Sequence, residues 1–272
     1  MQINNNFLLK KEKVRAKTII MMYNTAINPK ELFKEAIRTV YPRKCPGCRD
    51  VILPNMLVCD DCAGRFKLVE PPFCMKCGRH VEDEETELCD DCAAKDHHYS
   101  MGFSAFVYDG IMRQAMADLK YASAAENADY FADITAKTCG ERIRLFNPDV
   151  IIPVPIHRSR RAERGYNQAQ LISDRLSDMF GIPAVNDLLL RTRKTAALKI
   201  LDAAGRAENL KQAFSCDLKK YPRDEVSVRF GRVLLVDDIY TTGTTMECCT
   251  EALLDAGVEK VAVLSVAIGY NY

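Results

Sequence analysis

The sequence predicts an α/β fold, in which a parallel sheet has helices on both faces and is preceded by a small double zinc-ribbon domain. Three observations carry this prediction. From residue 103 onward, apolar segments typical of buried strands alternate with helix-like segments, as in a parallel sheet covered on both faces. Four Cys-x-x-Cys pairs precede them at the spacing of zinc ligands. Near the C-terminus, an apolar strand leads through an acidic pair and a threonine-glycine loop into a helix.

The overall composition bounds the protein class. At 272 residues, 48% of them apolar, one large domain or two smaller ones are expected. The formal net charge of +1 gives no overall field that would favour nucleic acid or a membrane surface. The apolar run 18–22 is too short for a signal-peptide core, and no later segment is long enough to insert into a bilayer. We therefore expect a cytoplasmic protein whose thiols stay reduced.

Three parts of the chain are predicted. Residues 1–28 are expected to be a poorly ordered N-terminal extension. Residues 29–95 are expected to form the double zinc ribbon with a leading helix at 29–40, and residues 96–272 the α/β domain.

The cysteine pairs predict two structural zinc sites. Each Cys-x-x-Cys knuckle presents two thiolates to a tetrahedral ion, and two knuckles complete the ligand set, which leaves no position for a catalytic water. Pairing consecutive knuckles closes the shorter loops and is favoured by entropy, while other pairings stay open. His80, His97 and His98 are expected to be ordinary surface or linker residues. The predicted ligands are Cys45, Cys48, Cys59 and Cys62 for the first zinc, and Cys74, Cys77, Cys89 and Cys92 for the second.

The elements of the α/β part follow from apolar periodicity and from breakers such as Asn147-Pro148-Asp149. The strand at 233–236 is expected to end at Asp237, because a strand interior cannot bury two carboxylates without partners. In chain order we expect strand 103–108, helices 111–120 and 125–143, strand 150–154, a loop at 157–166, helix 167–179, strand 188–190, a basic flap at 191–212, strand 233–236, helix 246–255 and strand 258–268.

The segment 231–246 predicts a site for a sugar phosphate. The backbone N–H groups of its loop and the start of the next helix suit a phosphate, and the two carboxylates suit the cis hydroxyls of a ribose. A P-loop is excluded because Thr244, not lysine, follows Gly243. The alternative is a plain strand, polar turn and capped helix. The segment resembles the PRPP-binding motif of type I phosphoribosyltransferases, which assigns the ribose to Asp237 and Asp238 and the 5′-phosphate to Thr241, Thr242, Gly243, Thr244 and Thr245.

Two basic segments are predicted to complete this site. The loop 157–166 follows a buried strand, the position at which such sheets bind ligands, and its arginines suit a pyrophosphate; the alternative is a solvated turn. The flap 191–212 has the mixture of glycine and basic residues expected of a lid, or else includes an ordinary amphipathic helix. The predicted pyrophosphate ligands are His157, Arg158, Arg160, Arg161 and Arg164, with Lys199 from the flap.

Taken together, the chain from about residue 29 to 269 resembles the ComF family of phosphoribosyltransferase-like proteins with a double zinc ribbon. The fragments RGYNQA, from Arg164, and VDDIYTTGTT, from Val236, are the most specific. Leu198 stands before Lys199, where the family usually has glutamine, so a flap contact is lost or moved. The other matching residues include Lys120, Tyr121, Tyr166, Asn167, Gln168, Arg206 and Asn209.

This resemblance implies Mg²⁺-dependent transfer of a phosphoribosyl group from PRPP to an unknown acceptor, and an association with DNA uptake in competence. Asp237, Asp238 and Lys199 would be the catalytic residues. The alternative is a non-catalytic PRPP or nucleotide binder that acts through a competence protein or single-stranded DNA. Acidic residues in the second ribbon, among them Glu82 and Glu84, favour a protein partner there over DNA.

Overall fold

A computed structural model describes residues 42–122, 124–192 and 213–269 of the chain. Residues 44–272 belong to one compact unit, which is described here by itself. The predicted N-terminal extension and leading helix lie outside the described residues, as does most of the flap, including Lys199, Arg206 and Asn209.

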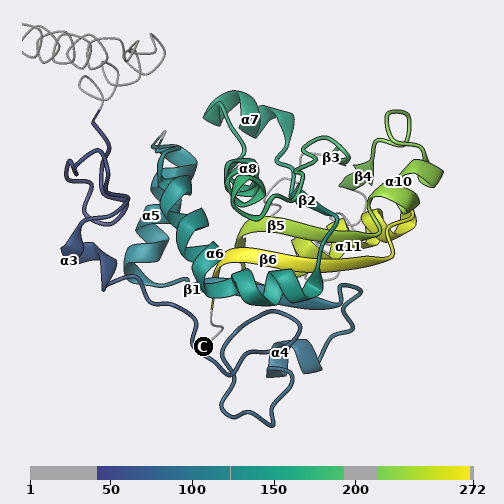
Figure 1. The fold of residues 1–272 in the computed structure, drawn as a ribbon, viewed down its shortest axis with the longest axis horizontal. Helices are drawn as coiled ribbons and strands as arrows, with labels where there is room; N and C mark the ends of the chain where they lie inside the picture. The colour runs from purple at the N-terminus through teal and green to yellow at the C-terminus, as the bar shows by residue number, and fades with distance from the viewer. Residues whose placement is uncertain (1–41, 123, 193–212, 270–272) are drawn as a thin grey trace, which may run out of the picture. The chain divides into compact units, whose positions relative to one another are not determined.

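The unit is built on a four-stranded parallel sheet with the strand order β1-β6-β5-β2 (Figure 1). Its strands are β1 (Met101–Val107), β2 (Val150–Pro153), β5 (Arg232–Tyr240) and β6 (Lys260–Ile268). Residues 233–236 of β5 and 261–268 of β6 are all buried, as expected of strands covered on both faces. The predicted parallel α/β sheet is therefore confirmed.

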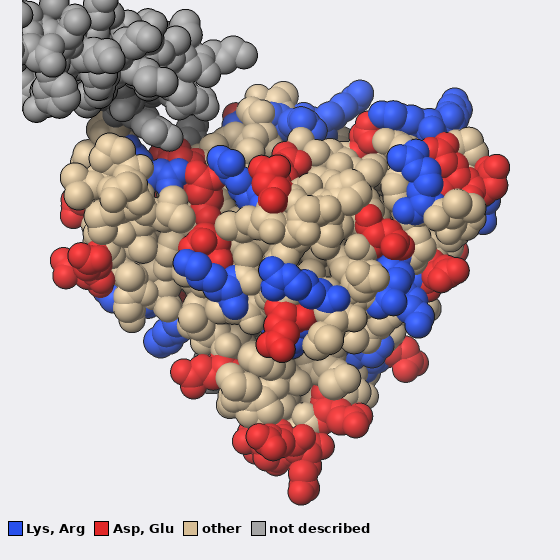
Figure 2. Space-filling model, in the orientation of Figure 1, with Lys and Arg blue, Asp and Glu red and all other residues tan. Residues whose placement is uncertain are grey.

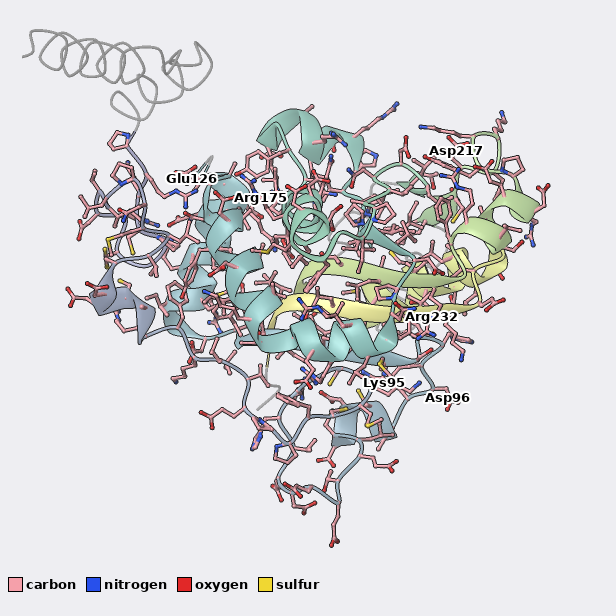
Figure 3. All side chains as sticks on the ribbon, in the orientation of Figure 1. Lys95, Asp96, Glu126, Arg175, Asp217 and Arg232 are labelled. Atoms are coloured by element: carbon pink, nitrogen blue, oxygen red, sulfur yellow. The ribbon has the colours of Figure 1, made fainter. Side chains whose placement is uncertain are left out.

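Side chains of β5 alternate between two cores. Leu234 and Val236 pack into one core with helices α6 (Asn127–Phe146) and α8 (Gln168–Phe180). Val233 and Leu235 pack into the other with helix α11 (Thr244–Asp255). On the first face, Arg175 of α8 pairs with Asp129 of α6 at 2.6 Å between Nε and Oδ1 (Figure 3). Helices thus cover both faces of the sheet, and the other described helices after β1 are α5 (Gly110–Tyr121), α7 (Arg158–Arg164) and α10 (Arg223–Arg229).

Two expectations about local structure are wrong. The predicted loop 157–166 contains helix α7, whose N-cap is His157: its Nδ1 accepts from the N–H of Ser159 at 3.2 Å. Strand β5 does not end at Asp237 but continues to Tyr240, because Lys120 neutralises Asp238, the second carboxylate of the pair. The short strand expected at 188–190 is present as β3 (Leu189–Arg191), and it pairs antiparallel with the unpredicted β4 (Phe214–Cys216), outside the main sheet.

The second zinc ribbon and the segment that joins the two ribbons pack against strand β1, at the edge of the sheet. The segment between the ribbons runs antiparallel to β1: the N–H of Val69 donates to the carbonyl of Ala105 and the N–H of Val107 to that of Lys67, both at 2.9 Å. The second ribbon approaches β1 so closely that a Cβ on Gly102 would lie 2.1 Å from the carbonyl oxygen of Lys76. Within the described ranges, no helix has the length and apolar character to cross a membrane.

Candidate functional site

The predicted cysteines form two clusters, each composed of two consecutive knuckles. In each cluster the four sulfurs lie within 4.8 Å of one another. Sulfur–sulfur distances are 3.5 Å for Cys45–Cys59, 3.8 Å for Cys48–Cys59 and 3.7 Å for Cys77–Cys89. A tetrahedral ion with Zn–S bonds of about 2.3 Å separates its ligands by about 3.8 Å, so both clusters fit zinc. The consecutive pairing of knuckles is confirmed, and the short helices α3 (Asp60–Ala63) and α4 (Asp90–Ala93) carry the last cysteine of each site.

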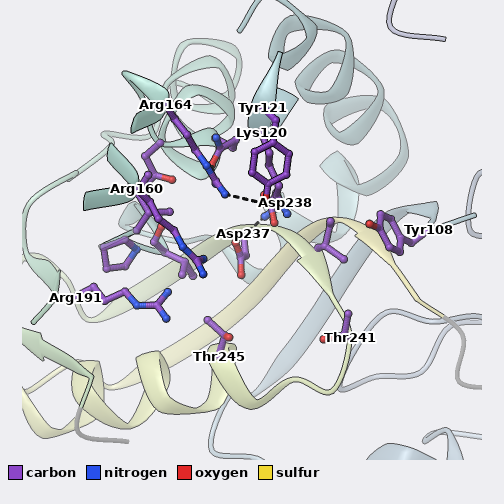
Figure 4. A pocket seen from close by; sticks show the side chains of 16 residues that line it. Tyr108, Lys120, Tyr121, Arg160, Arg164, Arg191, Asp237, Asp238, Thr241 and Thr245 are labelled. Carbon is purple, nitrogen blue, oxygen red and sulfur yellow. Dashed lines mark hydrogen bonds and ion pairs between the residues drawn. The ribbon is translucent and has the colours of Figure 1, made fainter. Parts of the chain in front are cut away.

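A polar cavity of about 300 Å³ opens at the carboxyl ends of β2 and β5 (Figure 4). This is the edge at which parallel sheets bind ligands. Helices α5 and α7, the start of α8 and the end of β3 supply the rest of its wall. The lining residues are Tyr108, Lys120, Tyr121, Val154, Pro155, Ile156, Arg160, Arg164, Asn167, Gln168, Arg191, Asp237, Asp238, Ile239, Thr241 and Thr245.

The two adjacent carboxylates of β5 have different environments. Asp238 pairs with Lys120 of α5, with 2.9 Å between Oδ2 and Nζ. Asp237 accepts the backbone N–H of Asp238 at 2.8 Å. Burial, followed by the charge of Asp238, raises the pKa of Asp237 to about 7, against the opposing effects of that N–H, Lys120 and Arg191. Asp238 is therefore paired with a cation. Among the described residues Asp237 has no cation contact of similar strength, and its pKa stays raised.

The threonine loop lies at the opposite wall of the cavity from α7 (Figure 4). Gly243 is the N-cap of α11 and has a left-handed backbone conformation with φ of 77°. The hydroxyls of Thr242 and Thr244 are 3.0 Å apart, whereas Thr241 and Thr245 line the cavity. Because α11 begins at this loop, its unpaired N–H groups and dipole favour an anion here.

Guanidinium groups of Arg160, Arg164 and Arg191 form the basic side of the cavity (Figure 4). Burial is the main cause that lowers the pKa of Arg191, and the nearby charge of Arg160 adds to the effect. Arg164 donates to Gln168 Oε1 at 3.0 Å and to the Tyr121 hydroxyl at 3.3 Å. Like charges held this close favour an anionic group with several oxygens.

The structure brings many of the predicted residues into one cavity, but not all of them. Of the predicted pyrophosphate ligands, Arg160 and Arg164 line it, and His157, Arg158 and Arg161 do not. Of the loop, Thr241 and Thr245 line the cavity, and Thr242, Gly243 and Thr244 do not. Tyr166 also lies outside the lining and supports α5, since its hydroxyl donates to the Leu119 carbonyl at 2.8 Å.

Two functional candidates were not among the predicted site residues. Tyr108 follows strand β1, which pairs with β6, so its place in the cavity wall depends on the strand order, which the sequence does not reveal. Arg191 was assigned only to the flap, yet it ends strand β3 and faces the cavity (Figure 4). The hairpin of β3 with β4, two short segments 22 residues apart, sets its position.

Comparison with known proteins follows the same division of the chain. The double zinc ribbon domain family matches residues 36–93, and the phosphoribosyl transferase domain family matches residues 129–268. The chain is 30% identical over 232 residues to competence protein F of Haemophilus influenzae, covering 82% of this chain and 96% of that protein. It is 24% identical over 216 residues to competence protein ComFC of Bacillus subtilis, covering 76% and 82% of the two chains.

Among solved structures, the glutamine PRPP amidotransferase of B. subtilis, complexed with ADP and GMP, is 23% identical with a TM-score of 0.34, covering 53% of this chain and 26% of that one. The match to Haemophilus competence protein F over nearly its whole length, and the two domain families in the same order, agree with each other. The chain therefore belongs to the ComF family, with a double zinc ribbon domain followed by a phosphoribosyl transferase domain.

Proposed function

We propose that this protein binds PRPP and transfers its phosphoribosyl group to an acceptor. The observation that carries the proposal is a single cavity lined by an acidic pair, a threonine loop at a helix start and three guanidinium groups. These groups match the ribose hydroxyls, the 5′-phosphate and the pyrophosphate of PRPP, respectively. Few other metabolites combine all three features within such a short span.

In this proposal each side of the cavity has one task. Asp237 and Asp238 orient the ribose hydroxyls, while the loop 241–245 holds the 5′-phosphate. Arg160, Arg164 and Arg191 neutralise the negative charge that grows on the leaving pyrophosphate. Since departure of pyrophosphate leaves an oxocarbenium-like sugar, the chain contributes chiefly by position and electrostatics.

Magnesium fits this site through the chemistry of its donors. The Asp237 carboxylate opens on the cavity, and carboxylate and phosphate oxygens are the ligands that Mg²⁺ prefers. When bound with PRPP, the ion would neutralise charge on the pyrophosphate. Lys199, Arg206 and Asn209 remain proposed contributors from the flap, and Thr242, Gly243 and Thr244 would contribute backbone and hydroxyl donors.

We also propose the biological setting and the domain limits. The relatives are named for competence and for DNA utilization, which supports a role in DNA uptake. Thiolate zinc ligands need a reducing compartment, which favours the cytoplasm. The limits 1–28, 29–95 and 96–272 are retained as the extension, ribbon domain and phosphoribosyltransferase-like domain.

A second candidate is a PRPP or nucleotide binder that does no chemistry and acts through a protein or single-stranded DNA. One observation favours it: Lys120 already pairs with Asp238, so this carboxylate is not free to act as a general base. A protein partner suits the second ribbon, because its tip is strongly acidic (Figure 2) and exposes Glu82, Asp83, Glu84, Glu85 and Glu87.

Calorimetry and a pyrophosphate assay separate these functions. We expect PRPP with Mg²⁺ to bind the wild-type protein, and Asp237→Asn/Asp238→Asn to lose that binding. Release of pyrophosphate with one of a panel of nucleobases and amines, absent in the double variant, supports the transferase. Binding without release on any acceptor supports the second candidate, and a folded, zinc-loaded protein that binds neither PRPP nor nucleoside monophosphates contradicts both.

A further inference from the structure

The side chain of Tyr240 lies directly against the glycine of the threonine loop. Tyr240 is the last residue of β5 and is only 5% exposed. A Cβ built on Gly243 would lie 2.2 Å from the Tyr240 hydroxyl oxygen. The phenol thus packs on the Gly243 backbone, and any movement of the ring changes the space available to the loop.

That hydroxyl is held by the segment that leaves the second zinc ribbon. Tyr99, which is completely buried, places its hydroxyl 2.9 Å from that of Tyr240. Tyr99 and Tyr240 belong to the same cluster of buried residues as Cys77 and Cys92. Two ligands of the second zinc site are therefore close neighbours of this tyrosine pair.

The same segment contacts the loop and the first turn of α11 at other points. Lys95, labelled in Figure 3 just after α4, donates from Nζ to the Thr242 carbonyl at 3.5 Å. Glu247 of α11 accepts the backbone N–H of His98 at 3.0 Å, and its other oxygen lies 3.3 Å from Nδ1 of His97. His97 in turn stacks on the Tyr99 ring, with 4.7 Å between centroids.

A further route joins the ribbon to the backbone of Tyr240. Arg79 pairs with Asp91 of α4 at 3.0 Å and donates to the carbonyl of Gly269 at 2.9 Å. The N–H of Gly269 donates to the carbonyl of Tyr240, also at 2.9 Å. Side chain and backbone of Tyr240 are thus both tied to residues adjoining the second zinc site.

We propose that the second zinc ribbon, acting through Tyr99 and Tyr240, holds the loop 241–245 in the conformation that receives the 5′-phosphate. Tyr240 is then a positioning residue for the ribose 5-phosphate part of PRPP, and zinc in the second site sets the affinity for that part. The inference rests on the proposed function for the identity of the phosphate. Its structural part, the hold on the loop, is independent of any ligand.

The first ribbon provides a natural comparison because it contacts a different element. Arg49 makes a two-point contact with Asp118 of α5, at 2.8 and 2.7 Å. Tyr130 is the matched tyrosine: it is 4% exposed and belongs to the same cluster of buried residues as Cys45 and Cys62 of the first zinc site. Tyr130 packs on Phe66 and Phe131 in the other core, away from the threonine loop.

The test uses two partial ligands, ribose 5-phosphate and pyrophosphate with Mg²⁺, measured by calorimetry on the full chain. Tyr240→Phe and Tyr99→Phe each remove one hydroxyl of the pair. We expect each to weaken ribose 5-phosphate binding about tenfold, the scale of one buried hydrogen bond, and to leave pyrophosphate binding unchanged. The double variant should be no weaker than the worse single one, since both act through one contact. Tyr130→Phe should change neither affinity.

Zinc ligands are tested by a second matched pair. Cys89→Ser and Cys59→Ser alter the same position of the second and first ribbons, and each should lower the zinc content from two ions per chain to one. We expect only Cys89→Ser to weaken ribose 5-phosphate binding. If either cysteine variant fails to fold, the tyrosine variants still decide the question.

Hydrogen–deuterium exchange of the ligand-free protein provides the readout that does not depend on PRPP. Amides of 241–247 should exchange faster in Tyr240→Phe and Tyr99→Phe than in the wild type and Tyr130→Phe. Unchanged exchange together with unchanged ribose 5-phosphate affinity overturns the inference, as does equal loss of both partial ligands. If wild-type protein binds neither ligand but the exchange difference is present, the proposed function fails and the hold on the loop stands.

Discussion

The ammonium group of Lys120 lies 2.9 Å from the carboxylate of Asp238, with both side chains largely shielded from solvent. This contact joins the last turn of α5 to β5 at the mouth of the cavity. It also explains why β5 continues through two adjacent acidic residues, since one of them is neutralised by a cation from a neighbouring helix.

Lys120→Met should destabilise the protein, because it leaves Asp238 ionised, shielded and unpaired. We expect a loss of about 1–3 kcal/mol in the free energy of unfolding, measured by urea denaturation, together with weaker PRPP binding. The matched control is Lys137→Met, which removes the exposed Lys137–Asp133 pair of α6 and should cost less than about 0.5 kcal/mol. Equal losses in the two variants would contradict this account of Asp238.

The raised pKa of Asp237 predicts a pH dependence of stability. The folded-state pKa of about 7 lies above the ordinary value of 3.8, so between these values the folded protein holds a proton that the unfolded chain has lost. The free energy of unfolding of the ligand-free protein should therefore fall as the pH rises from about 4 to about 7. Asp237→Asn should remove this fall and stabilise the protein at pH 8 by on the order of 2 kcal/mol, whereas Asp133→Asn should not.

Gly243→Ala should weaken binding of the 5′-phosphate. The residue has φ of 77°, and the added methyl group would collide with the Tyr240 hydroxyl, so the loop must change shape. We expect ribose 5-phosphate affinity to fall at least about tenfold, while pyrophosphate affinity is retained. Gly64→Ala is the control, since Gly64 has φ of −76° and nothing lies within 4 Å of a Cβ there. Normal ribose 5-phosphate binding by Gly243→Ala would argue against this loop as the phosphate site.

Arg158 and Arg160 of α7 should differ in their contribution to pyrophosphate binding. Arg160 lines the cavity, and Arg158, two residues earlier on α7, does not. Arg160→Ala should weaken pyrophosphate binding about tenfold through loss of a charge-assisted contact, and Arg158→Ala should change it less than twofold. Calorimetry at two salt concentrations checks whether the difference is local. A similar loss in both variants would indicate a diffuse basic surface in place of a built subsite.

Metal analysis should find two tightly bound zinc ions per chain. Replacement by Co²⁺ should give the thiolate charge-transfer absorption of four-cysteine sites, saturating at two equivalents. Cys139→Ser, a buried cysteine of α6 outside both clusters, should keep both equivalents even if it lowers stability. Because the ribbons depend on their ions for folding, removal of zinc by a chelator should lower the thermal midpoint of the wild-type protein.

Much of this architecture could be predicted because its signals are local. The cysteine spacing predicted both zinc clusters, and apolar runs predicted the strands of the parallel sheet. Helix α7 was missed because RSRRAER has no apolar face: none of its residues is buried. The end of β5 was misplaced because the partner of Asp238 is Lys120, more than a hundred residues earlier in the chain.

The cavity could be predicted only in part, for the same physical reason. Carboxylates and threonines on β5 and its loop are positioned by the strand that carries them. Which arginine of α7 faces the cavity depends on the tilt of a short exposed helix, and the position of Arg191 depends on the pairing of β3 with β4. Neither relation is encoded in a local pattern.

The backbone pairing of residues 67–69 with β1 has a consequence for biogenesis. An uncovered outer strand offers its free N–H and C=O groups to other chains and promotes aggregation. Here residues 67–69, which join the two zinc ribbons, pair with the free edge of β1. Chains made during zinc starvation should therefore expose this edge and accumulate as insoluble material. Supplementing the growth medium with zinc should prevent this accumulation.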